Sequence, residues 1–229
     1  MEAAEHCLRY LSGTVDLFIT YRGDADQRDG QERNTLWGWV DADYAADLNT
    51  RRSHTGYVLM LNGGPVSWKS TRQKSVSLST AESEWYAASE AGKEILYLRF
   101  ILHDFGFSQK GPTPLYEDSR AVICMSENPV NRKASRHIGT RRYFIGELVA
   151  DKLIKLVTCR TDKMVADALT KSLRLYMVGD SDATCTDDWT ERRRVGMPRK
   201  GKNENERLFL ALLRKIVLIV LSVMVWPTL

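Results

Sequence analysis

Residues 36–88 read LWGWVDADYAADLNTRRSHTGYVLMLNGGPVSWKSTRQKSVSLSTAESEWYAA, and this stretch decides the fold. The apolar run from Leu36 to Asp43 predicts a strand, and the run from Thr55 to Leu61 predicts a second one. Asn62-Gly63-Gly64 is a strong hairpin signal, because such residues accept the positive φ angles of a tight turn. A third strand is therefore expected over Pro65 to Lys69.

A long helix is predicted directly after this meander, from Ser79 to Phe105. Ser79 and Glu82 have the spacing of a capping box at its start. The later elements are a strand, two helices, a strand and a last helix, expected over Pro114–Glu117, Arg120–Glu127, Ser135–Asp151, Leu153–Cys159 and Met164–Leu173. A meander followed by alternating elements predicts an α/β fold with one five-stranded mixed sheet flanked by helices.

Length, charge and composition limit the number of domains, the partners and the compartment that can be expected. The chain has 229 residues and a net charge of +4, which allows one domain with flanking tails and gives no overall sign of a nucleic-acid binder. The four scattered cysteines form no CxxC pair, which disfavours a zinc site and fits a reducing, intracellular compartment in the cytoplasm or nucleus. The uninterrupted apolar run from Ile216 to Trp226 is about half of the ~20 residues that span a membrane, so a membrane partner is disfavoured.

Acidic residues in unusual places are the candidates for chemistry. Two divalent cations about 4 Å apart can activate a water and stabilise a leaving oxygen in phosphodiester hydrolysis, and Mg²⁺ prefers carboxylate ligands. Asp41 and Asp43 end the first strand on one face, because side chains alternate along a strand. Periodicity does not choose between them, and both could simply be turn residues.

Glu84 is the more telling of two helical glutamates. It shares its helix face with Ala88, Ala91 and Ile95, whereas Glu82 points about 200° away. Glu82 is expected to face solvent, where it complements the helix dipole. A carboxylate on an apolar face needs a partner, and a metal cluster would supply one.

Two further acids complete an ordered set. Asp118 ends the short fourth strand just before a helix, where the alternative is a simple N-cap. Asp167 lies on the last helix, beside Met164 and Lys171, where the alternative is an ordinary surface aspartate. Each acid is weak support alone, but together they place one acid on the first strand, the first helix, the fourth strand and the final helix.

Several motifs together resemble a known family. Residues 39–88, the segment YEDSRAVICMSENPVNRKASRHIGTRRYFIGELV from Tyr116 and the segment KMVADALTK from Lys163 resemble the ribonuclease H domain of copia-type (Ty/copia) retrotransposon Pol polyproteins. LRYLSGTVDLFITY, from Leu8, resembles the segment that connects the reverse transcriptase to that domain. The domains implied are a connection remnant over residues 1–22, a linker over 23–35, a ribonuclease H-like domain over 36–173 and an unassigned tail over 174–229.

The resemblance implies a ribonuclease H-like fold and a magnesium-dependent endonuclease that cuts the RNA strand of RNA–DNA hybrids with two ions, Mn²⁺ being an alternative. The family's catalytic and metal-binding acids map onto Asp41, Glu84, Asp118 and Asp167. The implied partners are a nucleic acid, specifically an RNA–DNA hybrid, and the reverse transcriptase domain of an intact polyprotein. One departure concerns the basic helix, which usually reads close to KHIDIRYHFIRE and here reads RHIGTRRYFIGE over residues 136–147.

Basic residues are expected to form a phosphate-binding track for the hybrid, since neutralised phosphates release counterions. The candidates are Lys69, Arg72, Lys74, Arg132, Lys133, Arg136, His137, Arg141 and Arg142. The alternative for the run is a solvated helix face, and for His137 a buried structural role.

Three functions compete. The first is an active hybrid-cutting nuclease, and the second is a catalytically idle remnant that keeps the fold and a weak affinity for nucleic acid. The third is a different nuclease on the same fold, such as an integrase or resolvase. The retained acids favour the first function, and the altered basic helix favours the second. The order of the acids and the ADALTK ending argue against the third.

Overall fold

One mixed sheet organises the part of the chain that the structure, a computed structural model, describes: residues 2–13, 15, 19, 21, 33–127 and 139–171. Its strands are β1 (Trp37–Asp43), β2 (His54–Leu61), β3 (Gly64–Arg72), β4 (Thr113–Glu117) and β5 (Ile154–Thr158). They lie in the order β3-β2-β1-β4-β5, with β1, β2 and β3 antiparallel and β4 parallel to both β1 and β5. The predicted α/β fold with a five-stranded mixed sheet is confirmed.

The hairpin between β2 and β3 forms where the sequence predicts it. Leu61 pairs with Gly64, and the two residues between them, Asn62 and Gly63, have φ angles of 52° and 78°. Positive φ at both central positions is the requirement of a type I′ turn, whose twist matches that of the flanking strands. β3 continues past the predicted end at Lys69 to Arg72, because pairing with β2 extends the strand through a segment without apolar alternation.

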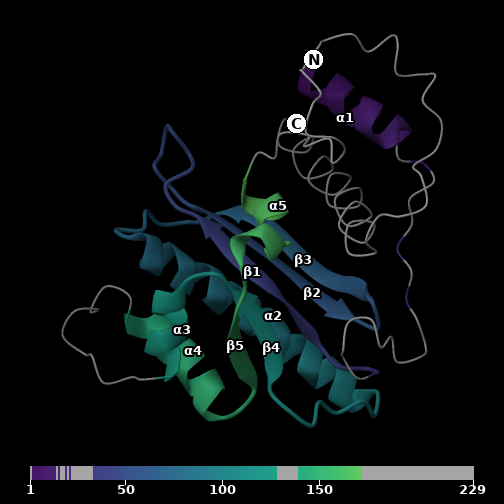
Figure 1. Cartoon of the computed structure of the whole chain (residues 1–229), viewed down its shortest axis with the longest axis vertical. Helices are drawn as coiled ribbons and strands as arrows, with labels where there is room; N and C mark the ends of the chain where they lie inside the picture. The colour runs from purple at the N-terminus through teal and green to yellow at the C-terminus, as the bar shows by residue number, and fades with distance from the viewer. Residues whose placement is uncertain are drawn as a thin grey trace.

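Helices lie on both faces of this sheet. They are α2 (Thr80–Asp104), α3 (Arg120–Glu127), α4 (Gly139–Ala150) and α5 (Asp167–Thr170), with a 3₁₀ turn at Thr161–Lys163, while α1 (Glu2–Ser12) precedes the sheet in sequence. Figure 1 shows α2 crossing behind the sheet and α5 in front of it. The predicted cap is present, since Ser79 Oγ accepts the Glu82 N–H and the Glu82 carboxylate accepts the Leu78 N–H.

The last of the predicted helices differs in length from the observed one. The last helix is a single turn, because the chain before it forms the 3₁₀ turn and a bend instead of a continuous helix. The basic helix is observed from Gly139 onward. The remaining parts of both predictions, residues 135–138 and 172–173, lie outside the described residues, as do most of the 23–35 linker and the 174–229 tail.

The sheet separates two apolar cores. The larger one lies between the sheet and α2, α3 and α4, and it includes the fully buried Val40, Trp85 and Leu115. The smaller one covers the opposite face beside α5, with Trp37, Val58, Met60 and Leu169 buried. Because each fully buried large apolar side chain contributes about 1.5–3 kcal/mol, the larger core holds α2 firmly against β1.

Within the described residues, every helix is too short or too polar to cross a membrane. The apolar run over residues 216–226 falls outside that part of the chain.

Candidate metal centre

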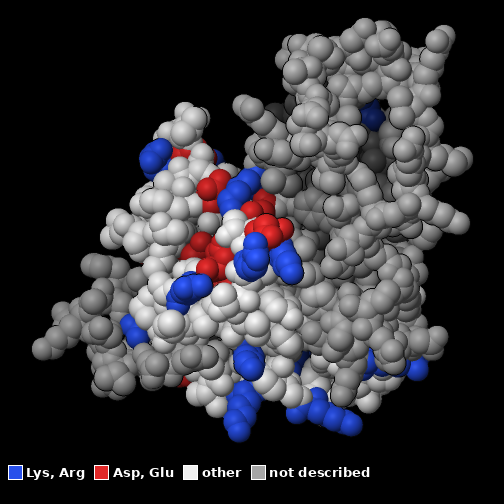
Figure 2. All heavy atoms as spheres, in the orientation of Figure 1, with Lys and Arg blue, Asp and Glu red and all other residues white. Residues whose placement is uncertain are grey.

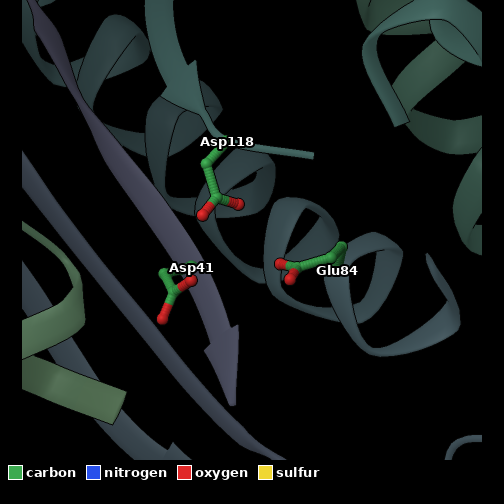
Figure 3. Close-up of side chains that lie close together, drawn as sticks. All are labelled: Asp41, Glu84 and Asp118. Carbon is green, nitrogen blue, oxygen red and sulfur yellow. The ribbon is translucent and has the colours of Figure 1, made fainter. Parts of the chain in front are cut away.

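Three carboxylates from three separate elements meet at one end of the sheet. Asp41 lies in β1, Glu84 in α2 and Asp118 directly after β4, and one ligand oxygen from each lies within 4.8 Å of the others. Figure 3 shows the three side chains around a common space. Asp41 is 1% exposed and Glu84 4%, while Asp118 is half-buried. The structure thus brings together three of the four acids that the sequence singled out.

The two buried acids arrive from opposite faces of the sheet. Asp41 belongs to the β1 face of Trp37 and Trp39, which is the face of the smaller core. Glu84 is on the α2 stripe that continues through Ala88 and Ala91, and both alanines are fully buried in the larger core. The face assigned to Glu84 from the helical periodicity is therefore the one that faces the sheet.

Gln73, which no sequence pattern singles out, ties the first turn of α2 to β2. Its side-chain amide is 1% exposed and donates to Thr55 Oγ1 at 3.1 Å and to the Ser83 carbonyl at 3.0 Å. Its oxygen accepts from Ser77 Oγ at 2.9 Å. A buried amide with its donors and acceptor satisfied holds its surroundings in one arrangement, so Glu84 is anchored by the residue before it.

The electrostatics of the cluster resist three ionised carboxylates. Burial raises the pKa of Asp41 to about 6, against the opposing effects of a hydrogen bond from Thr170 and the charge of Lys171. Burial raises the pKa of Glu84 to about 10, with further contributions from the negative charges of Glu117, Asp41 and Asp118. Desolvation and like charges therefore disfavour the ionised forms until a cation neutralises them.

Glu117 is a fourth acid at this end of the sheet, and it is buried like Asp41 and Glu84. It is fully buried, and burial raises its pKa well above the usual range. The backbone N–H of Ser119 donates to its Oε1 at 3.1 Å, but its Oε2 and the Oε2 of Glu84 have no hydrogen-bond partner. Buried oxygens without a donor are costly, and a hard divalent cation satisfies such oxygens. The donor set therefore fits a metal ion of the Mg²⁺ type.

The alternation of β4 contained the signal for Glu117. Thr113, Leu115 and Glu117 are in phase along the strand, and all three are buried. Period two would have assigned Glu117 to the face of Leu115, which is the face of the larger core. The EDS motif indicates Asp118 as the functional acid and gives no separate indication of Glu117.

Asp167 reaches the cluster indirectly. Lys171 Nζ lies 2.6 Å from Asp167 Oδ1 and 3.8 Å from Asp41 Oδ2, so one ammonium group bridges the first and fourth predicted acids. Thr170 Oγ1 donates a hydrogen bond to the same Oδ2 of Asp41. Asp167 is outside the set of three that could share one ion, and its charge acts on Asp41 from the α5 side.

Sequence comparison relates this chain to known proteins. No family model matches. The chain is 38% identical over 170 residues to a retrovirus-related Pol polyprotein from transposon TNT 1-94 of Nicotiana tabacum, covering 74% of this chain and 12% of that protein. It is 31% identical over 173 residues to the corresponding polyprotein from transposon RE2 of Arabidopsis thaliana, covering 75% and 11%.

The chain is a homologue of one segment of copia-type retrotransposon Pol polyproteins. The predicted resemblance is confirmed at this level. The chain spans only about a tenth of the length of these curated relatives. Among solved structures, a ribonuclease H1 isolated from compost, LC11-RNase H1, matches with a TM-score of 0.48 and 16% identity, over 60% of this chain and 93% of that one.

The predicted basic residues in and directly after β3 of this Pol homologue differ in their ion pairs. Lys69 pairs with Glu90 at 2.9 Å, and Arg72 pairs with Asp47. Lys74 is exposed, and no ion pair to it is present among the described residues. Figure 2 shows acidic side chains gathered around α5, with Lys and Arg side chains beside and between them.

The remaining predicted contacts belong to the basic helix. Arg141, near the start of α4, places its guanidinium 3.8 Å from the centroid of the Tyr86 ring on α2, and Arg142 is buried. Four further candidates, Arg132, Lys133, Arg136 and His137, lie outside the described residues. The structure thus describes Lys69, Arg72, Lys74, Arg141 and Arg142 of the predicted track.

Proposed function

We propose that this chain is a metal-dependent nuclease module that hydrolyses the RNA strand of RNA–DNA hybrids within a Pol polyprotein. The observation that carries the proposal is the cluster of Asp41, Glu84 and Asp118, in which buried carboxylates converge although they raise each other's pKa values. A fold does not retain such a cluster for stability, since apolar residues in its place would be less costly. The homology to Pol polyproteins supports the substrate class.

The chain's own residues would divide the work between holding cations and holding substrate. Asp41, Glu84 and Asp118 would hold one divalent ion, and Asp41 and Asp167 would flank a second. The ions, Mg²⁺ or Mn²⁺, would supply the activation of a water and the stabilisation of the leaving oxygen. The half-buried Asp118 lies at the solvent side of the cluster, where a scissile phosphate can approach.

Recognition of the hybrid would rest on its shape and its charge. Proteins read A-form helices through groove geometry, 2′-hydroxyls and phosphates instead of base edges. Lys74 and Arg141 both contact Tyr86, since the backbone N–H of Lys74 is 3.5 Å from the Tyr86 hydroxyl and the Arg141 guanidinium covers the ring. Both residues therefore lie beside the N-terminal half of α2, which carries Glu84.

Cleavage of a labelled hybrid tests the proposal directly. The full chain with Mg²⁺ is expected to shorten the RNA strand and leave the DNA strand intact, and EDTA is expected to stop the reaction. RNA–RNA and DNA–DNA duplexes of the same sequence are the controls. A folded chain that cuts none of the three substrates would favour the idle remnant, and one that cuts DNA–DNA duplexes would favour an integrase or resolvase activity.

Removal of the Lys74 charge is expected to weaken binding of the hybrid in a salt-dependent way. Each phosphate that a protein neutralises adds about 0.7–0.9 to the steepness of log K against log salt concentration, so the variant should show a slope shallower by that amount. Lys74→Ala is compared with Lys110→Ala, which removes an exposed charge near Gln109, a residue that contacts the start of β1. Binding is measured by fluorescence anisotropy in Ca²⁺, without turnover. Equal slopes in both variants would remove Lys74 from the predicted track.

A further inference from the structure

A row of three residues crosses the sheet at the level of the carboxylate cluster. Asp41 of β1 pairs with Gly56 of β2, and Gly56 pairs with Ser70 of β3. Directly paired residues of antiparallel strands project to the same face, so all three positions face α5. Each member of the row makes a different contact with that helix.

The first and third members make hydrogen bonds. The Thr170 hydroxyl donates to Asp41 Oδ2, and Ser70 Oγ donates to the Leu169 carbonyl at 2.6 Å. Thr170 is 8% exposed and Asp41 1%, so water does not compete effectively for the contact between them. α5 is therefore held by polar groups at both ends of the row, in a buried setting at Asp41 and at an exposed side chain at Ser70.

The middle member makes a contact that only glycine permits. A Cβ atom at Gly56 would lie 2.7 Å from Thr170 Cγ2, 2.8 Å from Leu169 Cβ and 2.9 Å from the Ala166 carbonyl oxygen. Real Cβ atoms do not approach other atoms this closely, so any side chain at residue 56 would push α5 away from the sheet. The missing side chain sets the depth at which Thr170 reaches Asp41.

We propose that Thr170, held at this depth by Gly56, is a positioning residue that orients the Asp41 carboxylate for a divalent cation. The inference deepens the proposed function and rests on the metal centre assigned there. Thr170 and Lys171 both approach Oδ2 of Asp41, so the orientation of the carboxylate is determined from the α5 side. Groups that hydrogen-bond to a metal ligand typically raise metal affinity 10–100-fold, and a contribution of this size is expected from the Thr170 hydroxyl.

The variant Thr170→Val removes the hydroxyl with little change in volume. Mn²⁺ affinity, measured on the full chain by calorimetry and by electron paramagnetic resonance without nucleic acid, is expected to fall about 10-fold or more. Thr170→Ser keeps the hydroxyl and is expected to bind Mn²⁺ as the wild type does. The matched control is Thr113→Val, at the opposite end of β4 from Asp118, where the threonine hydroxyl accepts from Arg99 at 2.9 Å.

A second variant keeps the test decisive if Thr170→Val fails to fold. Gly56→Ala retains every side chain of the cluster but displaces α5, and it is expected to lower Mn²⁺ affinity in the same direction. Wild-type affinity in a folded Thr170→Val or Gly56→Ala variant would overturn the positioning role. Metal binding that responds to these variants in a chain that cuts no hybrid would support the inference while contradicting the proposed function.

Discussion

Replacing Asp41 with asparagine is expected to lower metal-dependent cleavage of the hybrid at least about 1000-fold, which corresponds to about 4 kcal/mol of transition-state stabilisation. Asparagine preserves the size of the side chain and an oxygen that can accept from Thr170, so the fold is expected to persist. The variant lacks the negative charge through which Asp41 would hold both proposed ions. The measurement is the initial rate at saturating Mg²⁺.

Asp43→Asn is the matched control for this prediction. Asp43 ends the same strand on the same face, is half-buried, and does not belong to the cluster of three acids. It is expected to retain the wild-type rate, whereas Asp118→Asn is expected to behave like Asp41→Asn. Metal-dependent cleavage that persists in both the Asp41 and Asp118 variants would contradict the assignment of the centre.

Replacing Glu84 with glutamine is expected to stabilise the metal-free protein while it abolishes the stabilising effect of Mg²⁺. The pKa of Glu84 is raised by burial, and then by the charges of Glu117 and Asp41, to about 10. Glutamine removes the acid that burial and these charges disfavour. We expect the free energy of unfolding at pH 7 to rise by about 1–3 kcal/mol, the range for relieving an unfavourable buried polar group.

The pH dependence of this effect has a definite sign. Below the ordinary pKa of 4.5 Glu84 is protonated in both the folded and the unfolded state, and it costs nothing. As the pH rises from 4.5 towards 10, the unfolded state releases the proton and the folded state retains it, so folding becomes less favourable. Metal-free wild type should therefore lose stability over this range relative to Glu84→Gln.

Thermal and urea unfolding in EDTA and in Mg²⁺ would measure both effects. Saturation at about 100 times the dissociation constant stabilises a one-site protein by about 2.7 kcal/mol, and this increment is expected in the wild type but not in Glu84→Gln. Glu82→Gln, on the outer side of the same helix turn, is the matched control: it is expected to keep the Mg²⁺ increment and not to stabilise the metal-free protein, because the Glu82 charge complements the helix dipole. A destabilised Glu84→Gln variant would show that Glu84 contributes to the fold instead of straining it.

Local patterns predicted those parts of the fold and the site that depend on local geometry. The hairpin at Asn62 and Gly63 follows from turn stereochemistry, and the inward direction of Glu84 follows from the helical period. The length of β3 could not be predicted in this way, because residues after Lys69 are held by pairing with β2 and not by their own alternation.

Contacts between distant segments were beyond the reach of sequence patterns. Thr170 and Asp41 are separated by 129 positions, and neither residue type indicates that the other is its partner. The contact of Gly56 with α5 could not be predicted either, because a glycine within a strand indicates a close approach but not which group approaches. The ion pair between Lys171 and Asp167 is local, at four residues' spacing, but the second contact of Lys171 with Asp41 is not.

The contact between Thr170 and Asp41 also imposes an order on the emergence of the site during synthesis. The ribosome completes β1, α2 and β4, and with them the three clustered acids, before it reaches α5. A nascent or truncated chain that ends before Thr170 holds these acids without the hydroxyl that contacts Asp41. A chain built in this way would lack the contact on Asp41 until α5 has left the exit tunnel, and a premature stop codon only a few residues upstream would remove the contact permanently.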